Sequence, residues 1–308
     1  MSNMLTVGSL CTGIGGLELA LRQVLTTELL WVSETDPSAS QVLEHRFGVP
    51  NLGDLTKISK PPKVDIVMAG FPCQPVSYAG ERKGIDDKRW LIEDVCRVAS
   101  EAQARFLILE NVRGLLTANN GEALARVCAE MAYNGFGRWE WDTLRASRVG
   151  TPHRRDRWFC VATNSKSSNG RWSQHEAVVE TIRQATELRE RNSKDASIAD
   201  TAGWGLQGVR ARNRLEESEG DTATFSSFGP YEPAIRRWSA ITGVMPPHPV
   251  CDRGVEPAFV EWIMGFDKGW VTDLGLSMTA ELKTLGNAVV PLQGAVALGV
   301  LIQRLLEI

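Results

Sequence analysis

The chain has 308 residues, a formal net charge of −3 and 43% hydrophobic residues. This length suits one large domain, or one domain with a smaller insert, and the composition supports a substantial core. The slight negative charge argues against a general polyanion binder. The six cysteines show no CxxC pairing, which favours a reducing, cytoplasmic location. We find no signal-peptide pattern and no apolar run of transmembrane length, and the four histidines form no metal-ligand pattern.

The N-terminal part predicts a strand, a glycine turn and a helix. Residues 5–10 form an apolar strand, residues 11–16 carry three glycines, and apolar residues then recur at helical spacing over 17–25. This arrangement lets the backbone approach a nucleotide-like ligand. The next strand, residues 29–32, ends near Glu34, whose carboxylate is well placed to accept both hydroxyls of a ribose.

The following segment carries a helix start and a possible second ligand contact. Asp36 before Pro37 predicts an N-cap and a helix that runs to Phe47. Residues 53–55 are interpreted as the end of a third strand-like segment. There Asp54 is expected either to bind an adenine amino group or to cap a turn.

A cysteine follows the short apolar run at residues 64–68, which predicts a buried strand. Cys73 lies between Pro72 and Pro75, which restrict the backbone and so aim the thiol. Loops at strand ends are where open α/β sheets place their chemistry. A small buried cysteine in a turn is the competing interpretation, and this stretch alone does not decide between the two.

Strands and amphipathic helices then alternate. The strands are predicted at residues 106–109, 138–145 and 157–162, and the helices at residues 92–99 and 124–131. Cys96 and Cys128 lie on the apolar faces of these helices, so we interpret them as core residues. The alternation predicts an α/β fold with a doubly wound, mostly parallel sheet covered on both faces.

The composition changes after residue 163. Residues 164–253 are rich in polar residues without clean periodicity and are interpreted as an irregular inserted domain. Helical pattern returns at residues 257–264. The final helix, after residue 291, is so apolar that it must be buried, so residues 254–308 are expected to complete the domain formed by residues 1–163. Residues 138–171 contain eight basic and only three acidic residues. This excess of positive charge suits either contacts with phosphates or simply a solvated face.

Several of these features together resemble the DNA cytosine-5 methyltransferases in order and spacing, over roughly residues 4–163 and 255–293. The matching motifs are Gly13-x-Gly15-Gly16, Glu34, Pro72-Cys73-Gln74, Glu110-Asn111-Val112, Arg155-Asp156-Arg157 and Gly286-Asn287-Ala288-Val289-Val290-Pro291. The resemblance implies a Rossmann-like fold of the S-adenosylmethionine-dependent methyltransferases. It also implies that residues 164–253 form a smaller target-recognition domain.

The resemblance implies a covalent mechanism on a flipped-out cytosine in double-stranded DNA. The Cys73 thiolate would add to carbon 6, and Glu110 would hydrogen-bond ring nitrogen 3 and the exocyclic amine. Arg157 would hold oxygen 2, and Arg155 would support the closed loop or the base.

The family also implies a binding site for S-adenosylmethionine and no metal. The residues expected to line it are Cys11, Gly13, Ile14, Gly15, Gly16, Glu34, Thr35, Asp54, Leu55, Gly70, Pro72, Asn287 and Val289. Two positions depart from the family pattern. Cys11 stands where an aromatic residue usually stacks on adenine, which predicts looser cofactor binding, and His153 stands where the family usually has glutamine.

The resemblance further implies a monomer, no membrane partner, and a cognate restriction endonuclease that the protein need not contact. Residues 259–266 resemble the version found in many phage and prophage members. Trp172, Trp204 and Trp238 could read bases or form a small core.

Three alternatives compete with this interpretation. A tRNA cytosine-5 methyltransferase would carry the same motifs, although the insert is longer than that branch would need. A catalytically silent DNA-binding homologue would have no need to keep Cys73, Glu110 and Arg157 together. A nucleotide-modifying enzyme with a similar Pro-Cys nucleophile is disfavoured by the glycine turn.

Overall fold

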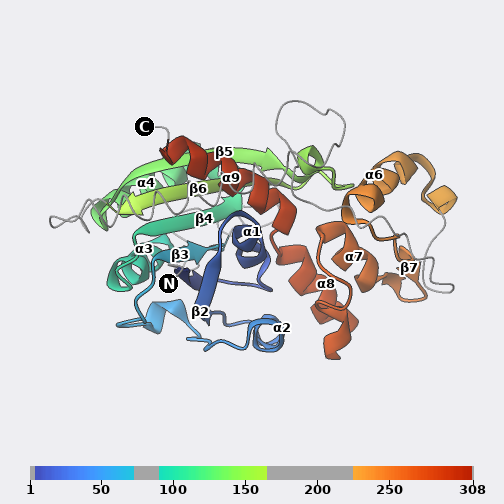
Figure 1. Ribbon diagram of the computed structural model, residues 1–308, viewed down its shortest axis with the longest axis horizontal. Helices are drawn as coiled ribbons and strands as arrows, with labels where there is room; N and C mark the ends of the chain where they lie inside the picture. Colours follow the sequence, from blue (N-terminus) through green and yellow to red (C-terminus); the bar gives the residue numbers. More distant parts are fainter. Residues whose placement is uncertain (1–3, 73–89, 165–224, 307–308) are drawn as a thin grey trace.

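The computed structural model describes residues 4–72, 90–164 and 225–306, and its centre is a six-stranded sheet with the order β2-β1-β3-β4-β6-β5 (Figure 1). The first four strands pair in parallel, whereas β6 pairs antiparallel with both β4 and β5. The prediction of an α/β fold with a mostly parallel sheet is therefore confirmed. The strands are β1 (Leu5–Leu10), β2 (Thr27–Ser33), β3 (Ile66–Ala69), β4 (Phe106–Val112), β5 (Phe136–Arg145) and β6 (Asp156–Asn164).

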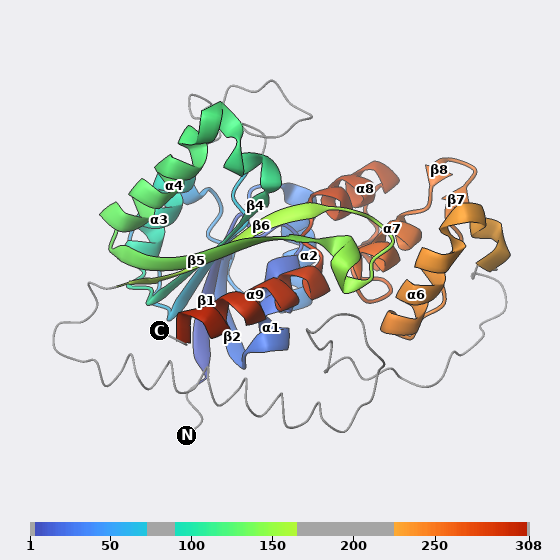
Figure 2. The ribbon, with the colours of Figure 1, turned by 90° about the horizontal axis from the view of Figure 1, so that it is seen from above.

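Helices cover both faces of this sheet, because alternate strand residues point to opposite sides. Val67 and Leu107 pack with α3 (Ile92–Glu101) and α4 (Glu122–Tyr133) on one face. On the other face, Ile66 and Ile108 join the cluster that contains α1 (Gly16–Val24) and α9 (Pro291–Leu306). Figure 2 shows the sheet edge-on between these two layers.

The C-terminal helix returns to the sheet, as its apolar composition predicted. The stretch Met278–Leu305 is long and apolar enough to cross a membrane, but 67% of its 18-residue apolar window, whose mean hydropathy is 1.8, is buried inside the protein. Helix α9 packs on α1, β5 and β6. Its hydropathy is therefore that of a core helix.

The segment after α2 (Pro37–Phe47) corrects one prediction. Residues 53–55 do not end a strand. A single bridge joins Val32 to Asn51, and Leu55–Lys57 then form the short 3-10 helix η1. The Asp54 side chain accepts hydrogen bonds from the backbone N–H and the hydroxyl of Thr56, which favours a tight turn over an extended chain.

Beyond the sheet, the described residues from 225 onward include a smaller unit. It contains α6 (Glu232–Thr242), the short strands β7 (Val250–Cys251) and β8 (Gly254–Val255), and α7 (Pro257–Met264). Phe228, Ile235 and Trp238 pack here against Trp262 of α7, and the Trp238 indole donates to the Trp262 carbonyl at 2.8 Å. Trp238 is thus a core residue. The cluster around Trp238 contains residues from both sides of residue 253, where the sequence predicts a domain boundary. Trp172 and Trp204 lie outside the described residues.

Candidate active site

A cavity of about 420 Å³ lies at the carboxyl ends of β1 to β4, where open α/β sheets bind their ligands. Each strand contributes the residues that follow it. Cys11, Gly13 and Ile14 follow β1; Glu34 and Thr35 follow β2; Gly70, Phe71 and Pro72 follow β3; and Glu110 and Asn111 end β4. Arg157 of β6 and three residues of α8 (Met278–Asn287) also line the cavity.

Of the three glycines in the turn after β1, one lines the cavity and two pack against other parts of the protein. Gly13 has a φ of 60°, and an added Cβ would meet no atom within 4 Å, so its backbone is open to a ligand. Gly15 and Gly16 do not line the described cavity. A Cβ on Gly15 would meet the Phe47 ring, and one on Gly16 would lie 2.2 Å from the Val289 carbonyl oxygen. Gly15 thus lets the start of α1 lie against Phe47 of α2, and Gly16 lets it lie against Val289, between α8 and α9.

We expect Gly16→Ala to lower the free energy of unfolding by about 1–3 kcal/mol, because the clash is with backbone that cannot rotate away. Chemical denaturation followed by circular dichroism measures this. Gly299→Ala is the matched control, since Gly299 lies in α9 with no atom within 4 Å of an added Cβ. That variant is expected to keep or slightly raise stability. Equal stability of Gly16→Ala and the wild type would contradict the packing role.

The Glu34 carboxylate links the end of β2 to the glycine turn by hydrogen bonds. One of its oxygens accepts from the Gly13 backbone N–H at 2.8 Å, and the other accepts from the N–H groups of Thr35 and Asp36, both at 2.8 Å. Asp36 itself caps α2 as predicted and forms an ion pair at 2.5 Å with Lys283 of α8. The acceptor predicted to meet a ribose is therefore held on the cavity wall by three backbone donors.

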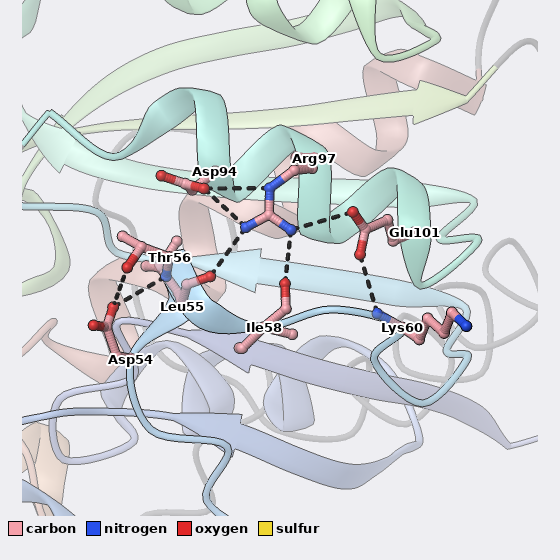
Figure 3. Close-up of polar contacts among 8 residues, drawn as sticks. All are labelled: Asp54, Leu55, Thr56, Ile58, Lys60, Asp94, Arg97 and Glu101. Atoms are coloured by element: carbon pink, nitrogen blue, oxygen red, sulfur yellow. Dashed lines mark hydrogen bonds and ion pairs between the residues drawn. The ribbon is translucent and has the colours of Figure 1, made fainter.

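Another part of the wall, formed by Asp54 and Leu55, is held by an arginine of α3 (Figure 3). Arg97 donates to the Ile58 carbonyl at 2.7 Å and to the Leu55 carbonyl at 3.2 Å. Its guanidinium also pairs with Asp94 and Glu101 on the same helix. Asp54 caps a turn through its hydrogen bonds with Thr56, which is one of the two roles predicted for it. It also lines the cavity.

Cys11 lies in the cavity wall in a left-handed backbone conformation, with a φ of 50°. Burial, with a smaller effect from the Glu34 charge, raises the pKa of its thiol to about 12. The thiol is therefore neutral at physiological pH and has little nucleophilic character. Cys11 is a wall residue.

A buried ion pair marks the inner end of the cavity. Arg157 Nε lies 2.9 Å from Glu110 Oε1, and both side chains are at least 85% buried. Burial raises the pKa of the Glu110 carboxyl, although the charges of Arg157 and Arg155 act in the opposite direction. A carboxyl whose proton is retained more readily, beside a fixed guanidinium, can donate to and orient a polar ring.

The residues that precede the predicted nucleophile, Cys73, lie at this same end of the cavity. Gly70 approaches Glu110 so closely that an added Cβ would lie 3.4 Å from its Oε2. The Asn111 side chain donates to the Phe71 carbonyl at 3.2 Å, and Pro72 lines the cavity. Cys73 follows Pro72 directly but lies outside the described residues, so its position remains a prediction.

The sequence is similar to that of a known protein family. The family model "C-5 cytosine-specific DNA methylase" matches residues 5–300. The chain belongs to this family. The type II methyltransferase M.BsuFI of Bacillus subtilis is 36% identical over 156 residues, covering 50% of this chain and 38% of the relative. M.HhaI of Haemophilus parahaemolyticus is 32% identical over 158 residues, covering 49% and 47%. These matches span less than half of each relative.

Two solved structures share the fold of this family member over nearly its whole length. The S. pombe Dnmt2 methyltransferase superposes with a TM-score of 0.58 at 17% identity, covering 98% of this chain and 99% of that one. The Entamoeba histolytica methyltransferase EhMeth gives a TM-score of 0.60 at 13% identity with the same coverage. Both comparisons support the methyltransferase fold.

Arg155, expected to support the loop or the base, contacts the end of α8 in this family member. Its guanidinium donates to the carbonyls of Gly286, at 3.0 Å, and Ala288, the two neighbours of Asn287. Asn287 lines the cavity, whereas Arg155 is not among its described lining residues. Arg155 therefore holds the end of α8 and positions Asn287.

His153 replaces the family's usual glutamine without loosening the approach to β6. Its Nε2 lies 3.1 Å from the Ile263 carbonyl oxygen at the end of α7. Burial lowers the pKa of the imidazole to about 4, so the ring is neutral at physiological pH. The neutral ring can donate one hydrogen bond to this carbonyl, as a glutamine amide would.

Several wall residues escaped sequence reasoning, among them two on α8. Lys283 and Thr284 line the cavity together with Asn287. The available signal was spacing, because positions 283 and 287 lie one turn apart on the same helix face. Lys283 follows no recognised motif, so that spacing alone did not single it out.

Proposed function

We propose that this protein is an S-adenosylmethionine-dependent DNA methyltransferase that modifies carbon 5 of cytosine. The observation that carries the proposal is the buried Glu110–Arg157 pair, which lines the same cavity as Glu34 and Gly13. Membership of the C-5 cytosine-specific family supports the reaction class. The chain matches only part of its curated relatives, so the activity of the whole protein is inferred from this site.

The wall residues fit the proposed cofactor. Glu34 offers carboxylate oxygens for the ribose hydroxyls, and Asp54 offers an acceptor for the adenine amino group. Gly13 leaves room for close approach of the ligand to the backbone. S-adenosylmethionine would supply an electrophilic methyl group, and Asn287, held by Arg155, would help to orient it.

The inner end of the cavity suits a cytosine ring. In our proposal the Cys73 thiolate adds to carbon 6, which makes carbon 5 nucleophilic. Glu110 donates its proton toward ring nitrogen 3 and accepts from the exocyclic amine, so that it stabilises the charge that addition creates. Arg157 holds oxygen 2. Once carbon 5 has gained the methyl group, loss of its proton expels Cys73 and restores the aromatic ring.

The target atoms are inaccessible inside a duplex, so the cytosine must be flipped out of the base stack. We assign target recognition to residues 164–253, of which the structure describes residues 164 and 225–253, including α6 and β7. We further propose that the protein acts as a cytoplasmic monomer. Its similarity to type II methyltransferases suggests protection of DNA against a restriction endonuclease that it need not contact.

Parallel transfer assays test this assignment. Tritiated S-adenosylmethionine is incubated with the protein and either duplex DNA containing many sequence contexts or total tRNA. We expect label in the DNA and none above background in the tRNA. Label in tRNA alone would establish the RNA-modifying alternative, and label in neither would favour a silent homologue, which the intact Glu110–Arg157 pair argues against.

A further inference from the structure

Two exposed arginines share one carboxylate beside the active site. Arg113 Nη1 lies 3.0 Å from Asp156 Oδ2, and Arg145 Nε lies 3.2 Å from the same oxygen. The arginine side chains are 55% and 57% exposed, whereas that of Asp156 is only 22% exposed. The three residues together carry a net charge of +1, and both guanidinium groups remain open to solvent.

This cluster of Arg113, Arg145 and Asp156 adjoins the cavity through the backbone. Val112, which directly precedes Arg113, lines the cavity and pairs with Arg157 across β4 and β6. Arg157 in turn directly follows Asp156. Each side of the cluster is therefore one residue away from the wall that holds the proposed target base.

Further exposed arginines lie between this cluster and the smaller unit that contains α6. Arg148 and Arg154 are exposed on the connection between β5 and β6, which includes the 3-10 helix η5 (Ala146–Val149). This connection lies beside α6, where Arg237 Nε donates to the Gly150 carbonyl at 3.5 Å (Figure 2). The cluster thus lies at the end of a connection that contacts the unit containing α6.

Stability alone gives little reason for this arrangement, because exposed ion pairs contribute about 0–1 kcal/mol. A phosphate offers a better reason. Guanidinium groups bind phosphate oxygens in a fork, and a carboxylate that fixes two of them reduces the entropy lost on binding. A nucleotide whose base enters the cavity also brings its own flanking phosphates close to the cavity mouth.

We propose that Arg113 and Arg145, oriented by Asp156, bind backbone phosphates of the duplex DNA strand that carries the flipped cytosine. This rests on the proposed function. Such contacts position the strand without reading its sequence, and they release counterions when they form.

Fluorescence anisotropy with a labelled duplex of mixed sequence tests the proposal, because phosphate contacts do not need the recognition site. Arg113→Ala and Arg145→Ala are each expected to weaken binding. Each should also reduce the slope of log K against log salt concentration by about 0.9. Arg113→Lys should recover most of the slope, since it keeps the charge. Affinity for S-adenosylmethionine, measured by calorimetry, should stay unchanged.

Arg126→Ala and Arg304→Ala are matched controls. Both arginines are about half exposed and pair with carboxylates, Glu93 for Arg126 and Asp142 for Arg304, and none of these four residues lines the cavity. Their salt slopes should equal that of the wild type.

The outcomes separate this proposal from the proposed function. Unchanged slopes in both alanine variants, with methyl transfer to DNA intact in the wild type, would overturn the phosphate site alone. Reduced slopes in a protein that transfers no methyl group to DNA would support the phosphate site and contradict the catalytic assignment.

Discussion

Replacing Glu110 with glutamine is expected to slow methyl transfer to duplex DNA by roughly 10²- to 10⁴-fold, the usual contribution of a positioned acid or base. Glutamine has nearly the same shape but carries no acidic proton, and it leaves Arg157 without its ionic partner. Burial raises the pKa of Glu110, so the native carboxyl retains its proton to higher pH than an exposed glutamate does. Single-turnover transfer of tritiated methyl groups measures the loss.

Binding of S-adenosylmethionine serves as the folding control for this variant, because Glu34 and Asp54 hold the proposed cofactor end of the cavity. The cofactor Kd should therefore change little. Glu93→Gln provides a matched carboxylate control, since Glu93 is 56% exposed on α3 and pairs with Arg126. A Glu110→Gln enzyme that kept the wild-type rate would remove Glu110 from the mechanism.

Cys73→Ser is expected to abolish both methyl transfer and covalent capture of DNA that contains 5-fluorocytosine. Fluorine on carbon 5 cannot leave as a proton, so a cysteine adduct formed during methyl transfer stays attached. A serine hydroxyl is a far weaker nucleophile than a thiolate at neutral pH. Denaturing gel electrophoresis after incubation with S-adenosylmethionine shows the adduct as a band of lower mobility.

Cys128→Ser is the control for that experiment. Cys128 lies on α4 and packs against the core, and burial raises the pKa of its thiol. This variant should form the adduct as the wild type does. Continued capture by Cys73→Ser would instead assign the nucleophile to another residue.

Much of the sheet could be predicted from short-range sequence pattern. The strand Leu5–Leu10 and the helix Pro37–Phe47 are found as expected, because an apolar run and an Asp-Pro start are strong local signals. The C-terminal helix α9 returns to the sheet because its apolar surface has to be buried. Residues 53–55 differ from expectation because the Asp54 side chain competes for the backbone of Thr56, a contact that hydropathy does not register.

The site was predicted less completely, since several of its contacts join residues far apart in the chain. Glu34, Glu110 and Arg157 meet at one cavity because the ends of β2 and β4 and the start of the antiparallel β6 lie at the same edge of the sheet. The bond from Arg155 to the end of α8 spans 131 residues to Gly286, and only the folded chain brings these groups together. The pairing of Asp36 with Lys283 spans 247 residues and is equally invisible in local sequence.

The central claim is that this cavity methylates carbon 5 of cytosine in DNA. Nucleoside mass spectrometry, combined with bisulfite sequencing, of DNA from cells that express the wild type or Glu110→Gln tests it most directly. We predict 5-methylcytosine at one short recurring sequence in the wild-type sample and its loss in the variant. Unmodified cytosine in both samples, or a methyl group on an exocyclic nitrogen, would contradict the account.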